Sequence, residues 1–278
     1  MDELRLDALG STCHLMGAGL HQGTLHRAGA WITAMHHRFS RFRADSEVWR
    51  LNAAAPRWVG VSVEMAALLL AALRAYELSG GLVHAGVLGP MLAAGYVRPL
   101  AEGPVPTPAS RARPLLPLPC VLEVDGTRAR LRAGYGIDLG GIAKGWMADA
   151  LAAQLGDNCL VNLGGDLYAR GEGPSGKGWP VGFGGITVSL RDRGAATSGV
   201  VRRCWLQDGE LRHHLIDPRT GRPAMTGVAQ VSAVAATALE AEVLAKTGLL
   251  LGPDAGPAYL AAHSQGWWLQ PWAGEGAA

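Results

Sequence analysis

The stretch of this chain richest in chemically useful groups runs from Leu211 to Pro223 and reads Leu-Arg-His-His-Leu-Ile-Asp-Pro-Arg-Thr-Gly-Arg-Pro. Histidine is the side chain whose unperturbed pKa best suits proton transfer near neutrality. The apolar pair Leu215-Ile216 predicts a strand that ends at Ile216, and Asp217-Pro218 predicts a bend after it. An imidazole would then lie near a strand end, beside a loop able to hold a phosphate. A surface hairpin whose histidines are solvated or satisfied in the core fits the same residues, and the stretch alone leaves both interpretations open.

The same stretch, from His214 to Gly221, resembles the signature of the ApbE family, flavin transferases that use FAD to attach FMN to a protein threonine or serine. Further blocks similar to those of the family follow its order along the chain. They are Met16-Gly17-Ala18, Phe39 to Glu47 closed by Leu51-Asn52, Asp138 to Trp146 with Asp149, Asn162 to Asp166, and Thr197-Ser198-Gly199. The resemblance runs from Met16 to about Gly252, which is nearly the whole chain.

The predicted elements favour an α+β fold, because helices and strands are interspersed without a steady βαβ rhythm. Periodicity and stop signals predict helices over 25–38, 63–78, 143–155 and 240–250, a short helix from Ser46-Glu47 to near Asn52, and strands over 121–124, 128–131, 159–163 and 228–236. No GxGxxG motif follows a strand. The resemblance implies one ApbE-like domain over 1–278, with mixed sheets and helices in two sub-structures and the flavin nucleotide in the cleft between them. The proline-rich stretch 99–119 would be an excursion between these sub-structures.

The composition is that of a globular protein, with 49% apolar and 17% charged residues. A formal charge of +2 argues against a nucleic-acid surface. The four cysteines form no CxxC pair, so neither a zinc site nor a disulfide framework is expected. The longest apolar run, 65–73, is far short of the ~20 residues that a membrane span requires. Because the chain shows no signal-peptide pattern and no lipobox cysteine, we expect a cytoplasmic enzyme, or a periplasmic one if a leader was removed.

The Asp138 to Gly145 block suits a nucleotide. Gly140 and Gly141 let the backbone approach a ligand closely, and the predicted helix behind them offers N–H groups and a positive dipole end to an anion. Lys144 would add charge near a pyrophosphate. A glycine turn needed only for packing, with a solvated lysine, explains the same residues. The resemblance implies flavin contacts at Met16, Phe42, Leu82, Val83, His84, Gly140, Trp146 and His214, to which the glycine turn adds Gly141 and Lys144.

The resemblance implies a reaction in which an acceptor hydroxyl attacks the FMN phosphorus of FAD and expels AMP. His214 is the candidate general base or orienting group, while His213 should point to the other side of the strand. Arg219, and Arg203 after the Thr197-Ser198-Gly199 block, are candidates to offset phosphate charge. The chain has no Asp-x-x-(Ser/Thr)-Gly-Ala-(Ser/Thr) acceptor motif of its own. The acceptor is therefore expected to be another protein.

The metal site implied by the resemblance is altered in this chain. The family holds Mg²⁺ with a backbone carbonyl, here that of Ala143, and with a late Ala-Asp-Ala-Leu-Ala-Thr segment. That segment reads Ala241-Glu-Val-Leu-Ala-Lys246 here, so the candidate metal positions are Ala143, Glu242 and Ala245. Lys246 stands at the threonine position, where its ammonium cannot donate a lone pair to a metal, and it should pair with Glu242 one helical turn away. An altered metal site, a lysine in place of the cation and lost catalysis are the three interpretations.

Two other departures are His84, where the family supplies an aspartate, and Trp179 to Thr187, where a strand-and-loop segment is shortened. The leading functional hypothesis is FMN transfer from FAD to an acceptor protein. The alternatives are a flavin-binding member without transfer activity, an enzyme that only hydrolyses FAD to FMN and AMP, and a non-enzymatic interaction protein that kept the scaffold.

Overall fold

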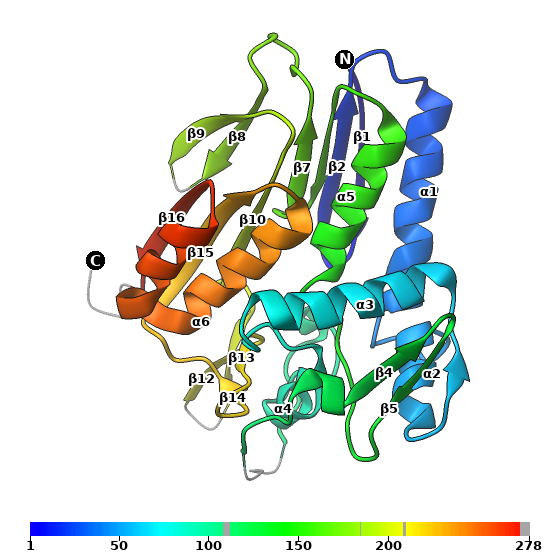
Figure 1. Ribbon diagram of the computed structural model, residues 1–278, viewed down its shortest axis with the longest axis vertical. Helices are drawn as coiled ribbons and strands as arrows, with labels where there is room; N and C mark the ends of the chain where they lie inside the picture. The colour runs from blue at the N-terminus through cyan, green and yellow to red at the C-terminus, as the bar shows by residue number, and fades with distance from the viewer. Residues whose placement is uncertain (108–111, 184, 208–209, 273–278) are drawn as a thin grey trace. The chain divides into compact units, whose positions relative to one another are not determined.

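The helices and strands of the molecule are drawn in Figure 1, from a computed structural model that describes residues 1–107, 112–183, 185–207 and 210–272. The helices are α1 (Gln22–Phe39), α2 (Glu47–Ala54), α3 (Val63–Leu78), α4 (Leu88–Ala93), α5 (Ala143–Leu155) and α6 (Ala238–His263). Short 3-10 turns lie at η1 (Ala85–Val87), η2 (Leu100–Glu102) and η3 (Leu118–Cys120). Helices and sheets together confirm the predicted α+β class.

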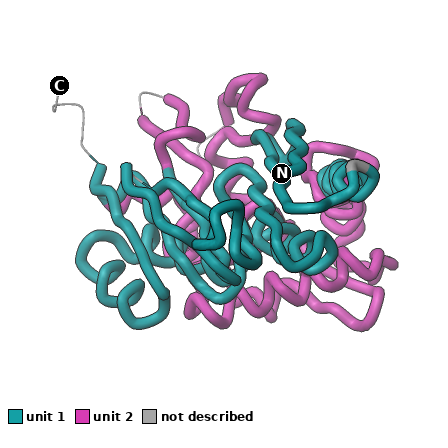
Figure 2. The backbone as a smooth tube through the Cα atoms, turned by 90° about the horizontal axis from the view of Figure 1, so that it is seen from above, with its two compact units in different colours: residues 1–36, 142–199, 227–278 teal, residues 37–141, 200–226 magenta. Residues whose placement is uncertain are grey.

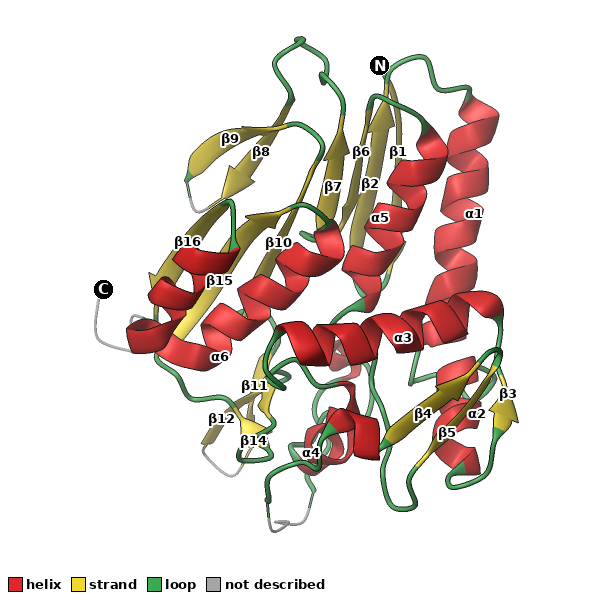
Figure 3. Cartoon of the chain, viewed as in Figure 1, coloured by secondary structure: helices red, strands yellow, loops and turns green. Residues whose placement is uncertain are grey.

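The strands fall into one large sheet and several small ones (Figure 3). The large sheet contains β1 (Asp2–Ala8), β2 (Ser11–Gly17), β6 (Cys159–Leu163), β7 (Leu167–Arg170), β10 (Arg193–Gly199), β15 (Val228–Ala235) and β16 (Gly266–Pro271), in that spatial order. The small sheets are formed by β3 (Val59–Gly60) with β5 (Arg128–Leu131) and β4 (Leu122–Asp125), by β8 (Trp179–Phe183) with β9 (Ile186–Leu190), by β11 (Cys204–Gln207) with β12 (Glu210–His213), and by β13 (Ile216–Asp217) with β14 (Arg222–Pro223). The pairings within the described residues are antiparallel.

The chain divides into two compact units (Figure 2). Unit 1 comprises residues 1–36, 142–199 and 227–278, and unit 2 comprises 37–141 and 200–226. The proline-rich stretch 99–119, expected between two sub-structures, instead lies within unit 2. Its described parts are fixed there by backbone hydrogen bonds, from Val105 N to Gly95 O and from Leu115 N to Pro218 O. Residues 108–111 lie outside the described part of the chain.

The two faces of the large sheet in unit 1 carry different elements. Alternation along β6 and β7 sends one set of side chains toward α5, where Cys159 Sγ and Arg170 Nη1 reach the carbonyl of Ala152. The other set, which includes Leu160 and Leu167, packs in a buried core with side chains of β8 and β9 such as Trp179 and Leu190. Because both faces are covered, β6 is an almost continuous apolar run.

In unit 2, capping fixes where the helices begin. The hydroxyl of Ser46 accepts a hydrogen bond from Trp49 N at the start of α2, and Ser62 accepts one from Met65 N at the start of α3. Helix α3 ends at Leu78, directly before Ser79 and two glycines, as the sequence pattern predicts. These ends place the loops that carry the candidate residues of unit 2.

The sequence predicts the longer helices and the strands β4, β5, β6 and β15, but it misses α4 and most of the other strands. The observed α3, α5 and β6 match the predicted ranges, whereas α6 continues from Ala238 to His263 rather than ending at Leu250. The backbone leaves helical geometry at Gly252 (φ 78°), and Pro253 restarts the helix because proline fits a first helical turn. The hairpin β1–β2 was not predicted. Among the described residues, no helix has the length and apolar character needed to cross a membrane.

Candidate functional site

The Asp-Leu-Gly-Gly turn of unit 2 is held by a buried arginine. Arg41 Nε lies 2.8 Å from Asp138 Oδ2, and the two side chains are 5% and 14% exposed. The same guanidinium donates to Tyr96 O at 2.8 Å and lies over the rings of Phe42 (4.0 Å) and Tyr96 (4.4 Å). Tyr96 and Phe42 therefore hold the guanidinium of Arg41 in place, and Arg41 in turn holds Asp138. Phe42, a predicted flavin contact, meets Tyr96 edge-on with its ring 38% exposed.

Asn52 fixes the residue before Asp138. Its Nδ2 donates to Ile137 O at 3.0 Å, and Ile137 N donates to its Oδ1 at 2.8 Å. Beyond the turn, Gly140 N donates to Asp138 Oδ1 at 2.9 Å and Gly140 itself is exposed. Arg41 and Asn52, from the early Phe39 to Asn52 block, thus position the glycine turn, in which Gly140 is exposed to solvent. Sequence reasoning did not assign these positioning roles, although the Leu-Asn end of the second block was a signal for them.

His84 stands where the family has an aspartate, and both of its ring nitrogens are hydrogen-bonded to backbone groups. Gly86 N donates to its Nδ1 at 2.9 Å, so the ring proton is on Nε2 and is donated to Leu116 O at 2.9 Å. Burial lowers the pKa of His84, which favours the same neutral form. Its neighbours Leu82 and Val83 are buried as well. The flavin contacts expected at these three positions stay predictions.

The Asp-Pro-Arg-Thr-Gly turn is organised by its aspartate, as the predicted bend requires. Asp217 Oδ1 accepts from Arg219 N at 2.8 Å, and the backbone carbonyl of Asp217 accepts from Gly221 N at 2.8 Å. The guanidinium of Arg219 meets both carboxylate oxygens, with Nε 2.9 Å from Oδ1 and Nη2 2.8 Å from Oδ2. The Arg219 side chain is 53% exposed while that of Asp217 is 11% exposed. The turn therefore exposes the guanidinium of Arg219 to solvent and holds it through the buried carboxylate of Asp217.

The two adjacent histidines before this turn differ in their surroundings. His213 is buried, its Nδ1 accepts from Leu215 N at 3.3 Å, and its Nε2 is 2.6 Å from Ala224 O. Burial lowers the pKa of His213. His214 follows β12 directly and is half-buried. Because His213 is tied to the backbone in its neutral form, His214 remains the better candidate for proton transfer.

In unit 1, the first turn of α5 carries a buried ion pair. Lys144 Nζ contacts Asp166 Oδ2, and the two side chains are 14% and 2% exposed. Asp166 is set by the tight turn between β6 and β7, in which Gly164 (φ 75°) and Gly165 (φ 102°) adopt left-handed conformations that favour glycine. Gly165 N donates to Asn162 Oδ1 at 2.8 Å, which closes the turn. The Asn-Leu-Gly-Gly-Asp block therefore places the carboxylate of Asp166 beside Lys144 at the start of α5.

A second buried pair lies beside it on α6. Lys246 Nζ is 3.8 Å from Glu242 Oε1, with the side chains 12% and 5% exposed, which confirms the predicted pairing. Glu242 Oε2 accepts from Gly145 N at 3.0 Å. Burial, and next the negative charge of Asp166, raise the pKa of Glu242, while Lys246 and Lys144 oppose that rise. Two ammonium groups and two carboxylates thus gather at the start of α5; we call Lys144, Asp166, Glu242 and Lys246 the lysine–carboxylate cluster.

The cluster depends on the close approach of α5 and α6. A Cβ atom on Gly145 would lie 2.7 Å from Ala238 O and 2.8 Å from Leu239 Cα, so only glycine fits. Asp149, one helical turn later, accepts from Ala238 N at 2.7 Å and from Leu239 N at 3.0 Å. Burial raises the pKa of Asp149 to about 6. Asp149, noted in the sequence only as part of a block, is a cap that docks α6 on α5.

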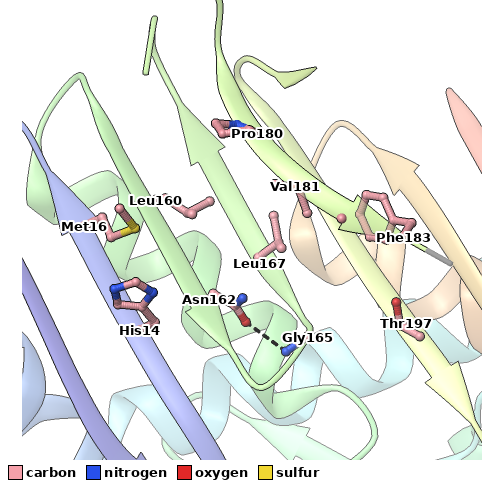
Figure 4. A pocket seen from close by; sticks show the side chains of 11 residues that line it. His14, Met16, Leu160, Asn162, Gly165, Leu167, Pro180, Val181, Phe183 and Thr197 are labelled. Atoms are coloured by element: carbon pink, nitrogen blue, oxygen red, sulfur yellow. Dashed lines mark hydrogen bonds between the residues drawn. The ribbon is translucent and has the colours of Figure 1, made fainter. Parts of the chain in front are cut away.

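Met16 is not part of this cluster. The register pairs Met16 with Leu160 and His14 with Asn162, so these side chains share the sheet face opposite α5. They line a pocket of about 320 Å³ with Thr197 of β10 (Figure 4). Trp146, another predicted flavin contact, stacks on Trp31 of α1 with ring centroids 6.2 Å apart. Within unit 1 the structure brings Lys144, Glu242 and Lys246 together and leaves Met16 on the other face.

The fold matches solved structures of ApbE proteins. The ApbE protein of Thermotoga maritima superposes with a TM-score of 0.82, at 27% identity, over 96% of this chain and 93% of that chain. The apo form of Pseudomonas stutzeri flavinyl transferase ApbE superposes with a TM-score of 0.78, at 26% identity, over 93% of this chain and 87% of that chain. The architecture is therefore that of this class of α+β proteins.

Sequence comparison leads to the same class. Residues 9–267 match the model of the ApbE family, and the chain belongs to that family. The FAD:protein FMN transferase of Vibrio cholerae is 29% identical over 249 residues, which cover 84% of this chain and 74% of that protein. The FAD:protein FMN transferase of Treponema pallidum is 39% identical over 142 residues, or 44% of this chain. The chain spans only 39% of the Treponema pallidum protein and 51% of a Klebsiella pneumoniae relative of the same name.

Proposed function

We propose that this protein transfers FMN from FAD to a serine or threonine hydroxyl of an acceptor protein and releases AMP. The observation that carries the proposal is the match to the ApbE family over residues 9–267, since the curated relatives are named FAD:protein FMN transferase. The substrate is FAD and the partner is a second protein. The alternatives weighed on the sequence, FAD hydrolysis and binding without transfer, have no observation of their own in their favour.

In this reaction the acceptor oxygen forms a bond to the FMN phosphorus, and the phosphoanhydride bond to the AMP half breaks. The hydroxyl loses its proton, and AMP leaves with the bridging oxygen. His214 is the group we assign to receive the proton, because its neighbour His213 is tied to Leu215 N and Ala224 O. Arg219, whose guanidinium is half-exposed at the turn, is assigned to the charge of the phosphates.

The glycine turn and the start of α5 are assigned to the nucleotide. Gly140 is exposed and its N–H is donated to Asp138 Oδ1, so the turn offers a nucleotide the close backbone approach that a residue without a side chain allows. Helix α5 begins at Ala143 without an acidic residue in its first turn, and its positive end suits an anion. Lys144 lies in that first turn. These features support a pyrophosphate at this position.

The magnesium ion implied by the family does not fit the residues present. One oxygen of Glu242 accepts from Gly145 N and the other faces Lys246 Nζ, so both are engaged. A divalent ion at ~2.1 Å from Oε1 would lie within about 6 Å of that ammonium. Their repulsion is at least about 5.5 kcal/mol at an effective dielectric constant of about 20. Among the described residues, no three His, Cys, Asp or Glu side chains gather to hold a metal.

The test is to incubate the full chain with FAD and an acceptor protein that carries an Asp-x-x-(Ser/Thr)-Gly-Ala-(Ser/Thr) motif. In-gel flavin fluorescence measures labelling, and chromatography measures AMP. Flavin on the acceptor together with an equal amount of AMP is the expected result. An acceptor whose motif hydroxyl is replaced by alanine should stay unlabelled.

Three other outcomes contradict the proposal, each in a different way. AMP and free FMN without labelling would make the protein an FAD hydrolase. FAD binding without AMP would make it a flavin-binding member that has lost transfer. No binding of FAD would leave an interaction protein on the same scaffold.

A further inference from the structure

The lysine–carboxylate cluster holds two of the only three lysines of the chain, which are Lys144, Lys177 and Lys246. Lys144 and Lys246 are 14% and 12% exposed, whereas Lys177 is exposed on the loop between β7 and β8. Burying an ammonium is unfavourable unless it is paired, and a buried ion pair is often no more stabilising than apolar packing of the same volume. Stability alone therefore does not account for placing these lysines here.

The position of the cluster suits an anionic ligand. Lys144 lies in the first turn of α5, whose N-cap is the apolar Ile142 and therefore supplies no capping side chain. Lys246 is brought to the same place because Glu242, one helical turn before it, binds Gly145 N at the start of α5. Two cations and a helix N-terminus thus converge. A phosphate that replaces the carboxylates as the partner of these ammonium groups meets positive charge without any metal ion.

The two ammonium groups are also able to change partner. Lysine carries a point charge on a flexible four-carbon stem with three rotatable donors, so its head group can exchange a carboxylate for a phosphate oxygen nearby. Glu242 and Asp166 keep other neighbours when this happens. Glu242 still accepts from Gly145 N, and Asp166 stays in the closed β6–β7 turn.

We infer that Lys246, together with Lys144, neutralises the pyrophosphate of FAD in this protein, in place of a divalent cation. This inference rests on the proposed function, which makes FAD the substrate. It adds that lysine ammonium groups supply the positive charge that offsets the pyrophosphate. Lys246 binds the phosphate oxygens directly, and its position over Glu242 keeps a divalent ion out. FAD binding is accordingly independent of metal.

The first experiment titrates the full, unmodified chain with FAD, following the quenching of flavin fluorescence, in EDTA and in millimolar Mg²⁺. The two dissociation constants should agree within about twofold, or about 0.4 kcal/mol. Tenfold tighter binding in Mg²⁺ would overturn the inference. Mn²⁺, a spectroscopic substitute for Mg²⁺, should also fail to bind stoichiometrically to the FAD complex in electron paramagnetic resonance. A stoichiometric Mn²⁺ signal would overturn it as well.

The second experiment changes the lysine. Lys246→Met removes the charge and keeps the stem, so the FAD dissociation constant should rise about tenfold or more in either buffer. Lys246→Thr returns an oxygen ligand and removes the repelling ammonium. Its binding should be as weak as that of Lys246→Met in EDTA and about tenfold tighter in Mg²⁺. A Lys246→Met variant that binds FAD like the parent would show that the ammonium does not contact the nucleotide.

Lys177→Met and Lys177→Thr are the matched controls, since they make the same changes on an exposed loop of the same unit. Both should bind FAD like the parent in both buffers. Circular dichroism establishes that each variant is folded; if the Lys246 variants are not, the EDTA, Mg²⁺ and Mn²⁺ measurements on the parent still decide.

The failures of the two proposals are distinguishable. Metal-dependent binding of FAD would leave FMN transfer standing and overturn only the role of Lys246. Absence of FAD binding in every buffer would contradict the proposed function and this inference together.

Discussion

The ion pairs at the candidate residues differ between the two units in how closely the backbone joins them. In unit 2 the pairs Arg41–Asp138 and Arg219–Asp217 are also tied to the main chain, because Arg41 donates to Tyr96 O, Asp138 accepts from Gly140 N, and Asp217 accepts from Arg219 N. In unit 1 the two lysines of the lysine–carboxylate cluster contact carboxylates, Lys144 that of Asp166 and Lys246 that of Glu242, and Glu242 also accepts from Gly145 N. A side chain tied to the backbone sets geometry. A side chain paired with another side chain can release it to a ligand.

This difference separates residues within a single family block. The Phe39 to Glu47 block contains chemically capable groups, yet Ser46 caps α2 and Glu47 Oε2 accepts from Ser62 N. The Asp138 to Trp146 block contains Gly145, required for helix packing, next to Lys144, which reaches Asp166. A sequence block is therefore not one functional unit. Its members divide according to whether the backbone or another side chain holds them.

The largest expected effect tests the pair of histidines in unit 2. His214→Ala should lower the rate of acceptor labelling by about 10²–10⁴-fold, because a positioned general base contributes that much. The FAD dissociation constant should stay within about tenfold, since the change removes proton transfer rather than the nucleotide contacts. Single-turnover labelling and FAD titration measure the two quantities separately.

The matched variant is His213→Ala, which removes hydrogen bonds with Leu215 N and Ala224 O. It should lower the free energy of unfolding by about 1–3 kcal/mol, as the loss of buried hydrogen-bond partners predicts. The folded fraction should keep most of its labelling rate. Equal loss of labelling from both changes in folded protein would show that the catalytic role is assigned to the wrong residue.

The next effect tests whether Arg41 sets geometry. Arg41→Met leaves Asp138 buried without its cation, which should lower the free energy of unfolding by about 3–5 kcal/mol. The control is Arg43→Met, two residues along the chain, where a 42%-exposed side chain pairs with the exposed Asp45. Its effect should be below about 1 kcal/mol. Urea unfolding measures both, and a similar small change for each would place Arg41 among the dispensable surface pairs.

The fold was predictable where local signals are strong. Helix α3 follows from apolar periodicity between Ser62 and two glycines, and α5 follows from the glycine turn before it. The hairpin β1–β2 was missed although Leu4, Leu6 and Ala8 alternate with charged residues, which is a strand pattern. The sequence does not show that β2 pairs with β6, far along the chain. The break in α6 at Gly252 reflects a backbone conformation that sequence periodicity does not show.

The candidate site was predictable in its residue types but not in their partners. Spacing on one helix predicts the Glu242–Lys246 pair, and the structure confirms it. The contact of Lys144 with Asp166 and the contact of Arg41 with Asp138 join residues 22 and 97 positions apart. Tertiary packing brings these residues together, so a pattern in a single sequence does not predict which of them are in contact.

A smaller effect tests the packing beneath the cluster in unit 1. Gly145→Ala places a methyl group 2.7 Å from Ala238 O, which must push α6 away from α5. Overpacking of this kind should lower the free energy of unfolding by about 1–3 kcal/mol, even though alanine favours helix by about 1 kcal/mol. Gly89→Ala in α4 is the control, because a Cβ there meets no atom within 4 Å. Thermal unfolding should show loss for Gly145→Ala and no loss for Gly89→Ala.

The smallest effect concerns Arg219, which combines both kinds of contact. Its backbone N–H and its guanidinium both bind Asp217, but the side chain is 53% exposed. Arg219→Ala should change the free energy of unfolding by less than about 1 kcal/mol, as for other exposed pairs. If the guanidinium offsets phosphate charge, AMP release should still fall about tenfold, or about 1.4 kcal/mol in activation free energy. Arg222→Ala, an exposed arginine of the same hairpin, should change neither quantity. An unchanged rate of AMP release for Arg219→Ala would assign this arginine to the geometry of the turn, with Arg41, and leave the phosphates to the lysines of unit 1.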